Sequence, residues 1–202
     1  MPPAATEIAH IPTNYKGGEI HIASLNYKNL KISAYIIEEL LKQHQIILIQ
    51  EHCLPVFEAQ INTIGDLNKN INFVGKGVDK YNPVLPKSML RGYGGVAIIW
   101  RENIDHLIKI LPDGAERIQC VEINSNNDTK LLVASVYLPS KGSHDYVDEF
   151  YDCIDQLCEI YQKYQGTHTI IIGGDLNEDL NNEKTNKRKK YLLDFIRVWL
   201  II

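Results

Sequence analysis

The sequence lacks the features that mark membrane, secreted and zinc-finger proteins. It has no apolar run long enough to span a bilayer, and its first residues lack the basic start and apolar stretch of a signal peptide. Its four cysteines form neither a CxxC pair nor a zinc-binding spacing. We therefore expect reduced, buried thiols in an intracellular protein, either nuclear or cytoplasmic, with no membrane partner.

The chain also has little excess charge and no internal repeat. Its net charge is −4, so nothing global demands a polyanionic partner, and a nucleic-acid role must rest on local features. With 202 residues, of which 45% are hydrophobic, the chain is long and apolar enough for one domain with a substantial core. We expect a flexible N-terminal lead-in over residues 1–18, one domain over residues 19–202, and a monomer.

The spacing of apolar residues predicts many strands and a few helices, which is typical of an α/β (α+β) sandwich with sheets inside and helices outside. Residues 75–92 and 181–190 read as polar, partly basic loops. The predicted strands cover residues 19–24, 46–49, 71–74, 95–100, 106–110, 117–123 and 130–137, and a last strand begins at residue 169. The predicted helices cover residues 30–43, 55–64, 144–165 and 188–199.

The most informative stretch is Thr169-Ile-Ile-Ile-Gly-Gly-Asp-Leu-Asn177, a buried strand that runs into two glycines and a polar turn. Side chains at i and i+2 of an extended segment point the same way, so Asp175 and Asn177 should face one cleft. The glycines let a ligand approach the backbone closely. This arrangement suits a metal ion, or a water activated beside a phosphate.

Three other predicted strands also end in polar groups, at Ser24-Leu-Asn26, Ile49-Gln-Glu51 and Ser135-Val-Tyr137-Leu-Pro139. In this order the set resembles the endonuclease/exonuclease/phosphatase superfamily. It is most similar to the apurinic/apyrimidinic-type endonuclease domains of non-LTR retrotransposons, which are associated with a reverse transcriptase. The resemblance implies a four-layered sandwich of the deoxyribonuclease I type, with two mostly antiparallel sheets flanked by helices.

The resemblance also implies roles for five residues in a metal-dependent phosphodiester hydrolase that nicks DNA. Glu51 would be the carboxylate ligand of Mg²⁺, or of Mn²⁺, and Asn26 would orient that carboxylate or bind the ion through water. Asp175 would orient or deprotonate the attacking water. Asn177 would hold the phosphate or that water, and Tyr137 would hydrogen-bond the phosphate or stabilise the transition state.

Each of these residues also has a purely structural interpretation. Glu51 could be an exposed loop charge, and Asn26 could cap the helix that begins near residue 30. Tyr137 could be a wedge between sheet and loop, and Asp175 and Asn177 could simply form a turn. Only their joint occurrence in this order favours a shared site.

Basic residues supply weaker hypotheses. The cluster that follows the Asp175 turn could contact a DNA backbone, or could be a solvated loop and helix start. We interpret His52 as a surface residue or a support for the metal ligands, and His144 as structural. The candidate nucleic-acid contacts are Arg91, Lys184, Lys187, Arg188, Lys189 and Lys190.

The sequence departs from the family pattern at its C-terminal end. Family members continue with a Ser-x-Ile-Asp strand and a terminal Ser-Asp-His, and neither occurs here. We therefore expect a C-terminally truncated domain that lacks its last strands and the histidine that acts at the phosphate. The alternatives are a catalytically dead relic or nucleic-acid-binding fragment, or a superfamily phosphatase or RNase with another phosphoester substrate.

Loss of that histidine should lower the rate by several orders of magnitude, because it removes an electrostatic or acid–base group. We predict weak or absent nuclease activity for the isolated chain in a metal-dependent plasmid-nicking assay, with Asp175→Ala as the control. Robust nicking that disappears in the control would contradict this prediction.

Overall fold

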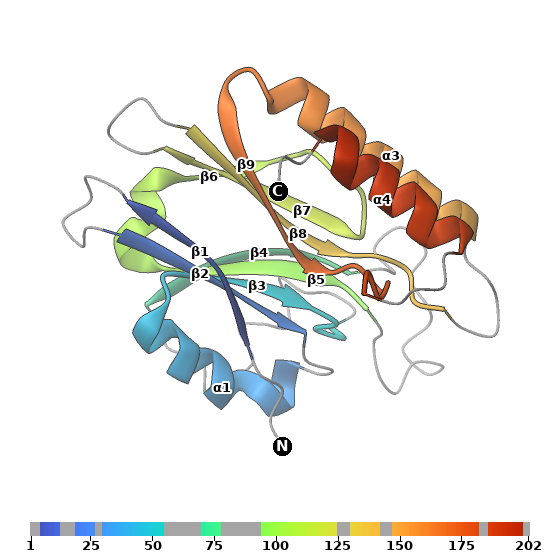
Figure 1. Cartoon of the computed structure of the whole chain (residues 1–202). Coiled ribbons are helices and arrows are strands. Elements are labelled where there is room, and N and C mark those ends of the chain that lie inside the picture. The colour runs from blue at the N-terminus through green and yellow to red at the C-terminus, as the bar shows by residue number, and fades with distance from the viewer. Residues whose placement is uncertain are drawn as a thin grey trace.

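The computed structural model shows two β-sheets packed face to face, with helices on both outer faces (Figure 1). The predicted helix over residues 55–64, most of the predicted loop 75–92, and Arg91, His144 and Lys184 lie outside the described residues. The structure describes residues 5–12, 19–26, 30–54, 70–77, 94–124, 130–141, 147–181 and 186–199.

The first sheet has five strands in the order β1-β2-β3-β5-β4. The β2–β3 pair is parallel, and the other pairs are antiparallel. One helix, α1 (Leu30–Gln43), covers the outer face of this sheet. The strands are β1 (Thr6–Pro12), β2 (Glu19–Asn26), β3 (Ile46–Gln50), β4 (Ile71–Lys76) and β5 (Val96–Arg101).

The second sheet has four strands in the order β6-β7-β8-β9, and only its β8–β9 pair is parallel. Two helices, α3 (Val147–Tyr164) and α4 (Lys187–Trp199), lie side by side on its outer face (Figure 1). A 3₁₀ helix (Glu102–Leu107) joins the two sheets. The strands are β6 (Ile108–Leu111), β7 (Ile118–Asn124), β8 (Lys130–Tyr137) and β9 (His168–Asp175).

This arrangement confirms the predicted four-layered sandwich with mostly antiparallel sheets. Alternate residues of each strand explain the layers, since successive side chains point to opposite faces. In β3, Leu48 packs between the sheets, whereas Ile47 packs against α1. In β8, Val133 packs between the sheets, whereas Leu132 packs against α3 and α4. The helices that the structure describes all fall short of the length and apolar character of a membrane span.

Two predictions about local structure are wrong. Residues 6–12 of the expected flexible lead-in form β1, because they pair with β2 along the edge of the sheet and bury part of Ile8 against the core. The strand predicted from residue 106 begins instead at Ile108, since His106 belongs to the 3₁₀ helix. The predicted helix over residues 188–199 is confirmed as α4, which begins one residue earlier.

The two glycines of β9 fit the strand closely to its neighbours on two sides. A Cβ atom on Gly173 would lie 2.5 Å from Ile8 Cδ1 and 2.8 Å from Leu48 Cδ1, which belong to the opposite sheet. Gly174 has φ +143°, and a Cβ there would lie 2.0 Å from the carbonyl oxygen of Val136 in the adjacent strand β8. Gly173 therefore lets β9 approach the first sheet just before Asp175, and Gly174 lets it stay paired with β8.

We predict that Gly174→Ala lowers the free energy of unfolding by about 3 kcal/mol or more, because it adds both a disfavoured φ and a clash with backbone. Urea unfolding measures this change. Gly166→Ala is the matched control, since no atom lies within 4 Å of a Cβ placed there. An equal, small effect of both substitutions would show that the glycine at 174 is not required.

Candidate active site

The layer between the sheets changes from apolar to polar at one end of the strands. In β2 the inward positions run from Ile22 through Ser24 to Asn26, and in β3 Leu48 is followed by Gln50. The same change occurs in the second sheet, where Val133 is followed by Ser135 and Tyr137, and Ile171 by Gly173 and Asp175. The carboxyl ends of two parallel strand pairs, β2–β3 and β8–β9, meet at this end.

The side chain of Asn26 joins two carboxylates that come from opposite sheets. Its Nδ2 atom donates hydrogen bonds to Glu51 Oε1 at 3.3 Å and to Asp175 Oδ2 at 2.5 Å. Asn26 is therefore not the cap of α1, which begins four residues later. All three side chains are partly buried, so the group borders both core and solvent.

Tyr137 completes the group from β8, where it is the register partner of Asp175. Burial and the negative charge of Glu51, to which its hydroxyl is hydrogen-bonded, raise the pKa of Tyr137 to about 12. The Arg117 guanidinium, 5.4 Å from the centre of the ring, acts in the opposite direction. The phenol therefore stays protonated at neutral pH and can donate a hydrogen bond.

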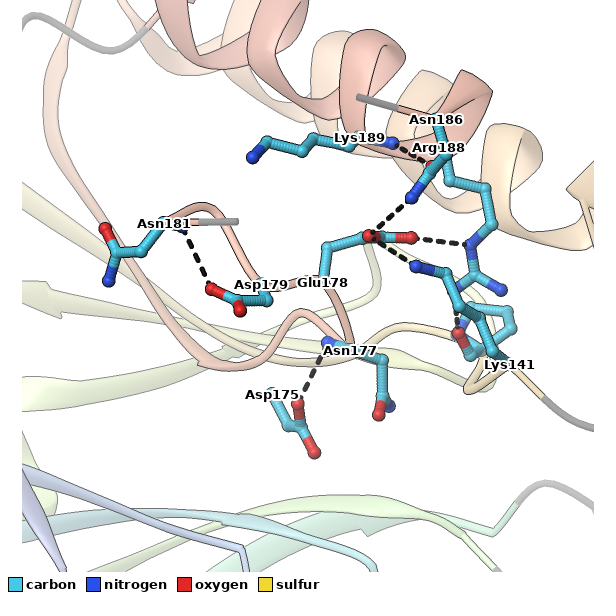
Figure 2. A network of polar contacts seen from close by, with 10 residues as sticks. Lys141, Asp175, Asn177, Glu178, Asp179, Asn181, Asn186, Arg188 and Lys189 are labelled. Atoms are coloured by element: carbon cyan, nitrogen blue, oxygen red, sulfur yellow. Dashed lines mark hydrogen bonds and ion pairs between the residues drawn. The ribbon is translucent and has the colours of Figure 1, made fainter. Parts of the chain in front are cut away.

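The turn after β9 holds Asp175 and Asn177 on one side of the chain (Figure 2). The backbone N–H of Asn177 donates to Asp175 Oδ1 at 2.9 Å, and its side-chain Nδ2 donates to the carbonyl of Leu138 at 2.7 Å. The backbone at Asn177 is left-handed, with φ 49°. Asp175 and Asn177 therefore lie on one side of the chain because of a turn, and not because of the extended backbone that the sequence suggested.

A buried chain of hydrogen bonds lies directly beneath these residues. The Ser24 hydroxyl donates to Gln50 Oε1 at 3.1 Å, and Gln50 Nε2 donates to Ser135 Oγ at 3.1 Å. The Ser135 hydroxyl donates in turn to the carbonyl of Ile49 at 3.3 Å. Gln50 thus connects the two sheets one layer below Asn26 and Tyr137.

Glu51 lies in a tightly held loop after β3, with φ 55°. Its N–H donates to the carbonyl of Gly95 at 2.9 Å, and the N–H of Cys53 donates to the carbonyl of Gly94 at 3.0 Å. Between them, His52 accepts a hydrogen bond from the N–H of Leu54 on Nδ1 at 3.0 Å. The backbone therefore dictates where the Glu51 carboxylate lies.

His52 is fully buried, so the expectation of a surface residue is wrong. Since Nδ1 accepts a hydrogen bond, Nε2 carries the proton and donates it to the carbonyl of Lys76 at 3.0 Å. Burial lowers the pKa of His52 to about 4, although the bond to Lys76 acts in the opposite direction. The ring fills the space beside Gly95, where a Cβ would lie 2.2 Å from its Nε2.

The expected basic cluster is not a uniform surface patch. Arg188 and Lys189 are buried, whereas Lys187 and Lys190 are exposed at the start of α4. The guanidinium of Arg188 pairs with the buried carboxylate of Glu178, so direct contact of Arg188 with a nucleic acid is contradicted. The cysteines are free thiols, and three of the four are buried, as expected.

Several residues of the site were not predicted from the sequence. Gln50 and Ser135 could have been found, because both are polar residues at inward positions of otherwise apolar strands. Arg117 and Lys76 had no such signal. Lys76 Nζ donates to the carbonyls of Asp113, Gly114 and Ile118 at 3.2, 2.8 and 3.0 Å, and so holds the loop that ends at Arg117.

The donor set fits a hard divalent cation. The carboxylates of Glu51 and Asp175 both lie within hydrogen-bonding distance of the Asn26 carboxamide at a partly buried point, and Mg²⁺ prefers one or two carboxylates plus waters. Among the described residues, no three His, Cys, Asp or Glu side chains cluster in a way that could hold a metal ion by themselves. Any bound ion would therefore keep waters or substrate oxygens as ligands.

The pKa of His52 makes a prediction about stability. The pKa of His52 is lower in the folded chain than the value of about 6.5 expected after unfolding. The contribution of the neutral ring to the free energy of unfolding is therefore complete above pH 6.5 and is lost as the pH falls toward 4. We predict that the free-energy difference between wild type and His52→Gln narrows by about 3 kcal/mol from pH 7 to pH 4. Urea unfolding at several pH values measures it, and parallel curves for the two proteins would contradict it.

Solved structures with the same fold are distant in sequence. The AP endonuclease LMAP from Leishmania major has a TM-score of 0.59 at 16% identity, over 87% of this chain and 65% of that chain. The APE2 catalytic domain from Xenopus laevis has a TM-score of 0.62 at 15% identity, over 86% of this chain and 67% of that chain. ANGEL2, described as a 2′,3′-cyclic phosphatase, has a TM-score of 0.53 at 10% identity, over 89% of this chain and 57% of that chain.

These likenesses confirm the fold, and this chain spans about two thirds or less of the length of each of the three proteins. No curated protein matches the sequence significantly. The sequence profile described as the Endonuclease/Exonuclease/phosphatase family matches residues 34–197, which is most of the chain. Because this profile covers most of the chain, the protein belongs to the Endonuclease/Exonuclease/phosphatase family.

Proposed function

We propose that the chain is a metal-dependent phosphodiester hydrolase that nicks DNA. The observation that carries this proposal is that Asn26 is hydrogen-bonded to both Glu51 and Asp175. The proposed metal ligand, Glu51, and the proposed base, Asp175, therefore lie at one point. Glu51 and Asp175 come from opposite sheets, and the Asn26 side chain links the two carboxylates across the space between the sheets.

Glu51 is the proposed ligand of Mg²⁺, for which Mn²⁺ could substitute, and Asn26 orients its carboxylate. The ion would supply charge neutralisation at the phosphoryl oxygens and help for the leaving oxygen. The left-handed backbone at Glu51 and its bond to Gly95 keep the carboxylate pointing toward Asn26. A ligand fixed by its own backbone loses little freedom when it binds an ion.

Asp175 would then accept a proton from the attacking water, or orient that water in line with the scissile bond. Its Oδ1 atom accepts the Asn177 N–H and its Oδ2 atom accepts Asn26, so the plane of the carboxylate is fixed from two sides. Tyr137, protonated because its pKa is raised, would donate a hydrogen bond to a phosphoryl oxygen.

DNA is the proposed substrate because of the resemblance to endonuclease domains of non-LTR retrotransposons. On this proposal the chain belongs to a mobile element, and a reverse transcriptase domain would act with it in the parent element. The exposed Lys187 and Lys190 lie in the first turn of α4, and on this proposal they would contact the DNA backbone. RNA and small phosphoesters are the alternative substrates, since the fold is shared with a protein described as a 2′,3′-cyclic phosphatase.

The test separates metal binding from turnover. We predict that Glu51→Gln weakens Mn²⁺ binding about 10- to 100-fold by calorimetry. We also predict that Asp175→Asn leaves binding nearly intact but slows nicking of supercoiled plasmid by about 100-fold or more. The matched control is Glu102→Gln, an exposed carboxylate on the 3₁₀ helix.

Parallel assays on single-stranded RNA and on a nucleoside 2′,3′-cyclic phosphate decide the substrate class. If either compound is cleaved faster than the plasmid, the substrate is of that class and the proposal of DNA is wrong. Metal binding that is unaffected by Glu51→Gln would remove the proposed centre altogether.

A further inference from the structure

Two opposite charges lie buried behind the turn that carries Asp175 and Asn177. The side chain of Glu178 is 1% exposed and that of Arg188, on α4, is 3% exposed. Figure 2 shows Glu178 pointing toward α4, away from the side on which Asp175 and Asn177 lie. The pair is therefore not part of the candidate site, although Glu178 directly follows Asn177 in the chain.

Glu178 anchors its turn to three separate groups. Its Oε1 atom lies 3.2 Å from Arg188 Nε, and its Oε2 atom accepts hydrogen bonds from Lys141 Nζ at 2.8 Å and Asn186 Nδ2 at 3.3 Å. Lys141 belongs to the segment after β8, and Asn186 precedes α4. One carboxylate thus fixes the turn after β9 relative to two other elements.

Arg188 reaches from this carboxylate to the second loop of the site. Its Nη2 atom donates to the carbonyl of Pro139, two residues after Tyr137, and its guanidinium stacks 4.2 Å from the centre of the Phe150 ring. The Phe150 ring is itself fully buried against the second sheet. Arg188 therefore holds both the turn with Asp175 and the loop after Tyr137 from one rigid helix.

The same two loops are also hydrogen-bonded to each other at the site. The N–H of Leu138 donates to the carbonyl of Asp175 at 2.9 Å, and Asn177 Nδ2 donates to the carbonyl of Leu138. A shift of either loop would break these bonds and separate Tyr137 from Asp175. Arg188 and Glu178 oppose such a shift by holding both loops on the side that faces α4.

Stability alone is a poor explanation for this pair. Arg188 Nε and Nη1 and Glu178 Oε1 have no well-aligned hydrogen-bond partner within the described part of the chain. Buried charges whose hydrogen bonds are incomplete are often no more stabilising than apolar residues of the same volume. What apolar residues could not supply is a hydrogen bond to the Pro139 carbonyl together with an ion pair with Glu178.

We infer that Arg188, through Glu178 and the Pro139 carbonyl, is a positioning residue that holds the turn with Asp175 and Asn177 against the loop after Tyr137 in the active site. This inference deepens the proposed function and rests on it, since the reaction is what this placement serves. The guanidinium is required because it reaches both partners at once, the Pro139 carbonyl by a hydrogen bond and Glu178 by an ion pair.

The experiment compares four variants of the full chain in Mn²⁺-dependent plasmid nicking. Arg188→Met, which keeps the volume, and Glu178→Gln should lower kcat about 10- to 100-fold, with KM and Mn²⁺ affinity within about twofold of wild type. Arg188→Lys should recover the Tm of wild type but not its kcat, because an ammonium group cannot serve both acceptors. Arg197→Met, exposed on the last turn of the same helix, is the control and should match wild type.

Amide hydrogen exchange supplies a readout that needs no activity. Exchange at Leu138 and Asn177, whose N–H groups bond to Asp175, should quicken at least tenfold in Arg188→Met, whereas amides within β7 should not change. If the wild-type chain neither binds Mn²⁺ through Glu51 nor cleaves any of the substrates, the proposed function fails. Unchanged exchange at these two amides would overturn the positioning role separately. Wild-type kcat in Arg188→Met, or a recovery of kcat in Arg188→Lys, would also overturn it.

Discussion

The hydrogen bonds of Gln50 are the constraint on which the rest of the structure depends. Apolar side chains hold the two sheets together, but their attraction is non-directional and sets no unique register between the sheets. Gln50 accepts from Ser24 within its own sheet and donates to Ser135 of the other, so a slide would leave buried polar groups unsatisfied. Asn26 and Asp175 contact each other across the sheets only while that register is kept.

The site then follows from where the strands end. Each inward row is apolar until its last one or two positions, so the polar ends collect at one edge of the layer between the sheets. Glycine at 173 lets β9 lie close enough to the first sheet for Asp175 to join residues of that sheet. The left-handed backbone at Glu51 and Asn177 turns the chain just after the strands end and keeps both side chains at this edge. Such strain is tolerated where surrounding bonds fix it, as those from Gly95 and Leu138 do here.

The periodicity of the sequence was sufficient for most of the described strands, for the described α-helices and for the polar strand ends, because these depend on local patterns. The structure brings Asn26, Glu51, Tyr137, Asp175 and Asn177 together, as their order had suggested. What local patterns could not show depends on distant partners. The strand at residues 6–12 exists because β2 offers an edge, His52 is buried because Gly95 leaves room for its ring, and Arg188 is buried because Glu178 faces it.

The charges around the site favour a bound cation over a purely protein-based mechanism. A phosphodiester brings negative charge to a point that already holds Glu51 and Asp175, and the transition state adds more. Within the described residues, the nearby cations are committed elsewhere: Arg117 pairs with Glu149 at 2.7 Å, Arg188 pairs with Glu178, and Lys76 is held by three carbonyls. Releasing Arg188 would leave the buried Glu178 carboxylate without this partner, and releasing Lys76 would free the loop before β7. A divalent ion on Glu51 would balance the charge without breaking these contacts, so metal dependence is the part of the proposal that the electrostatics support most directly.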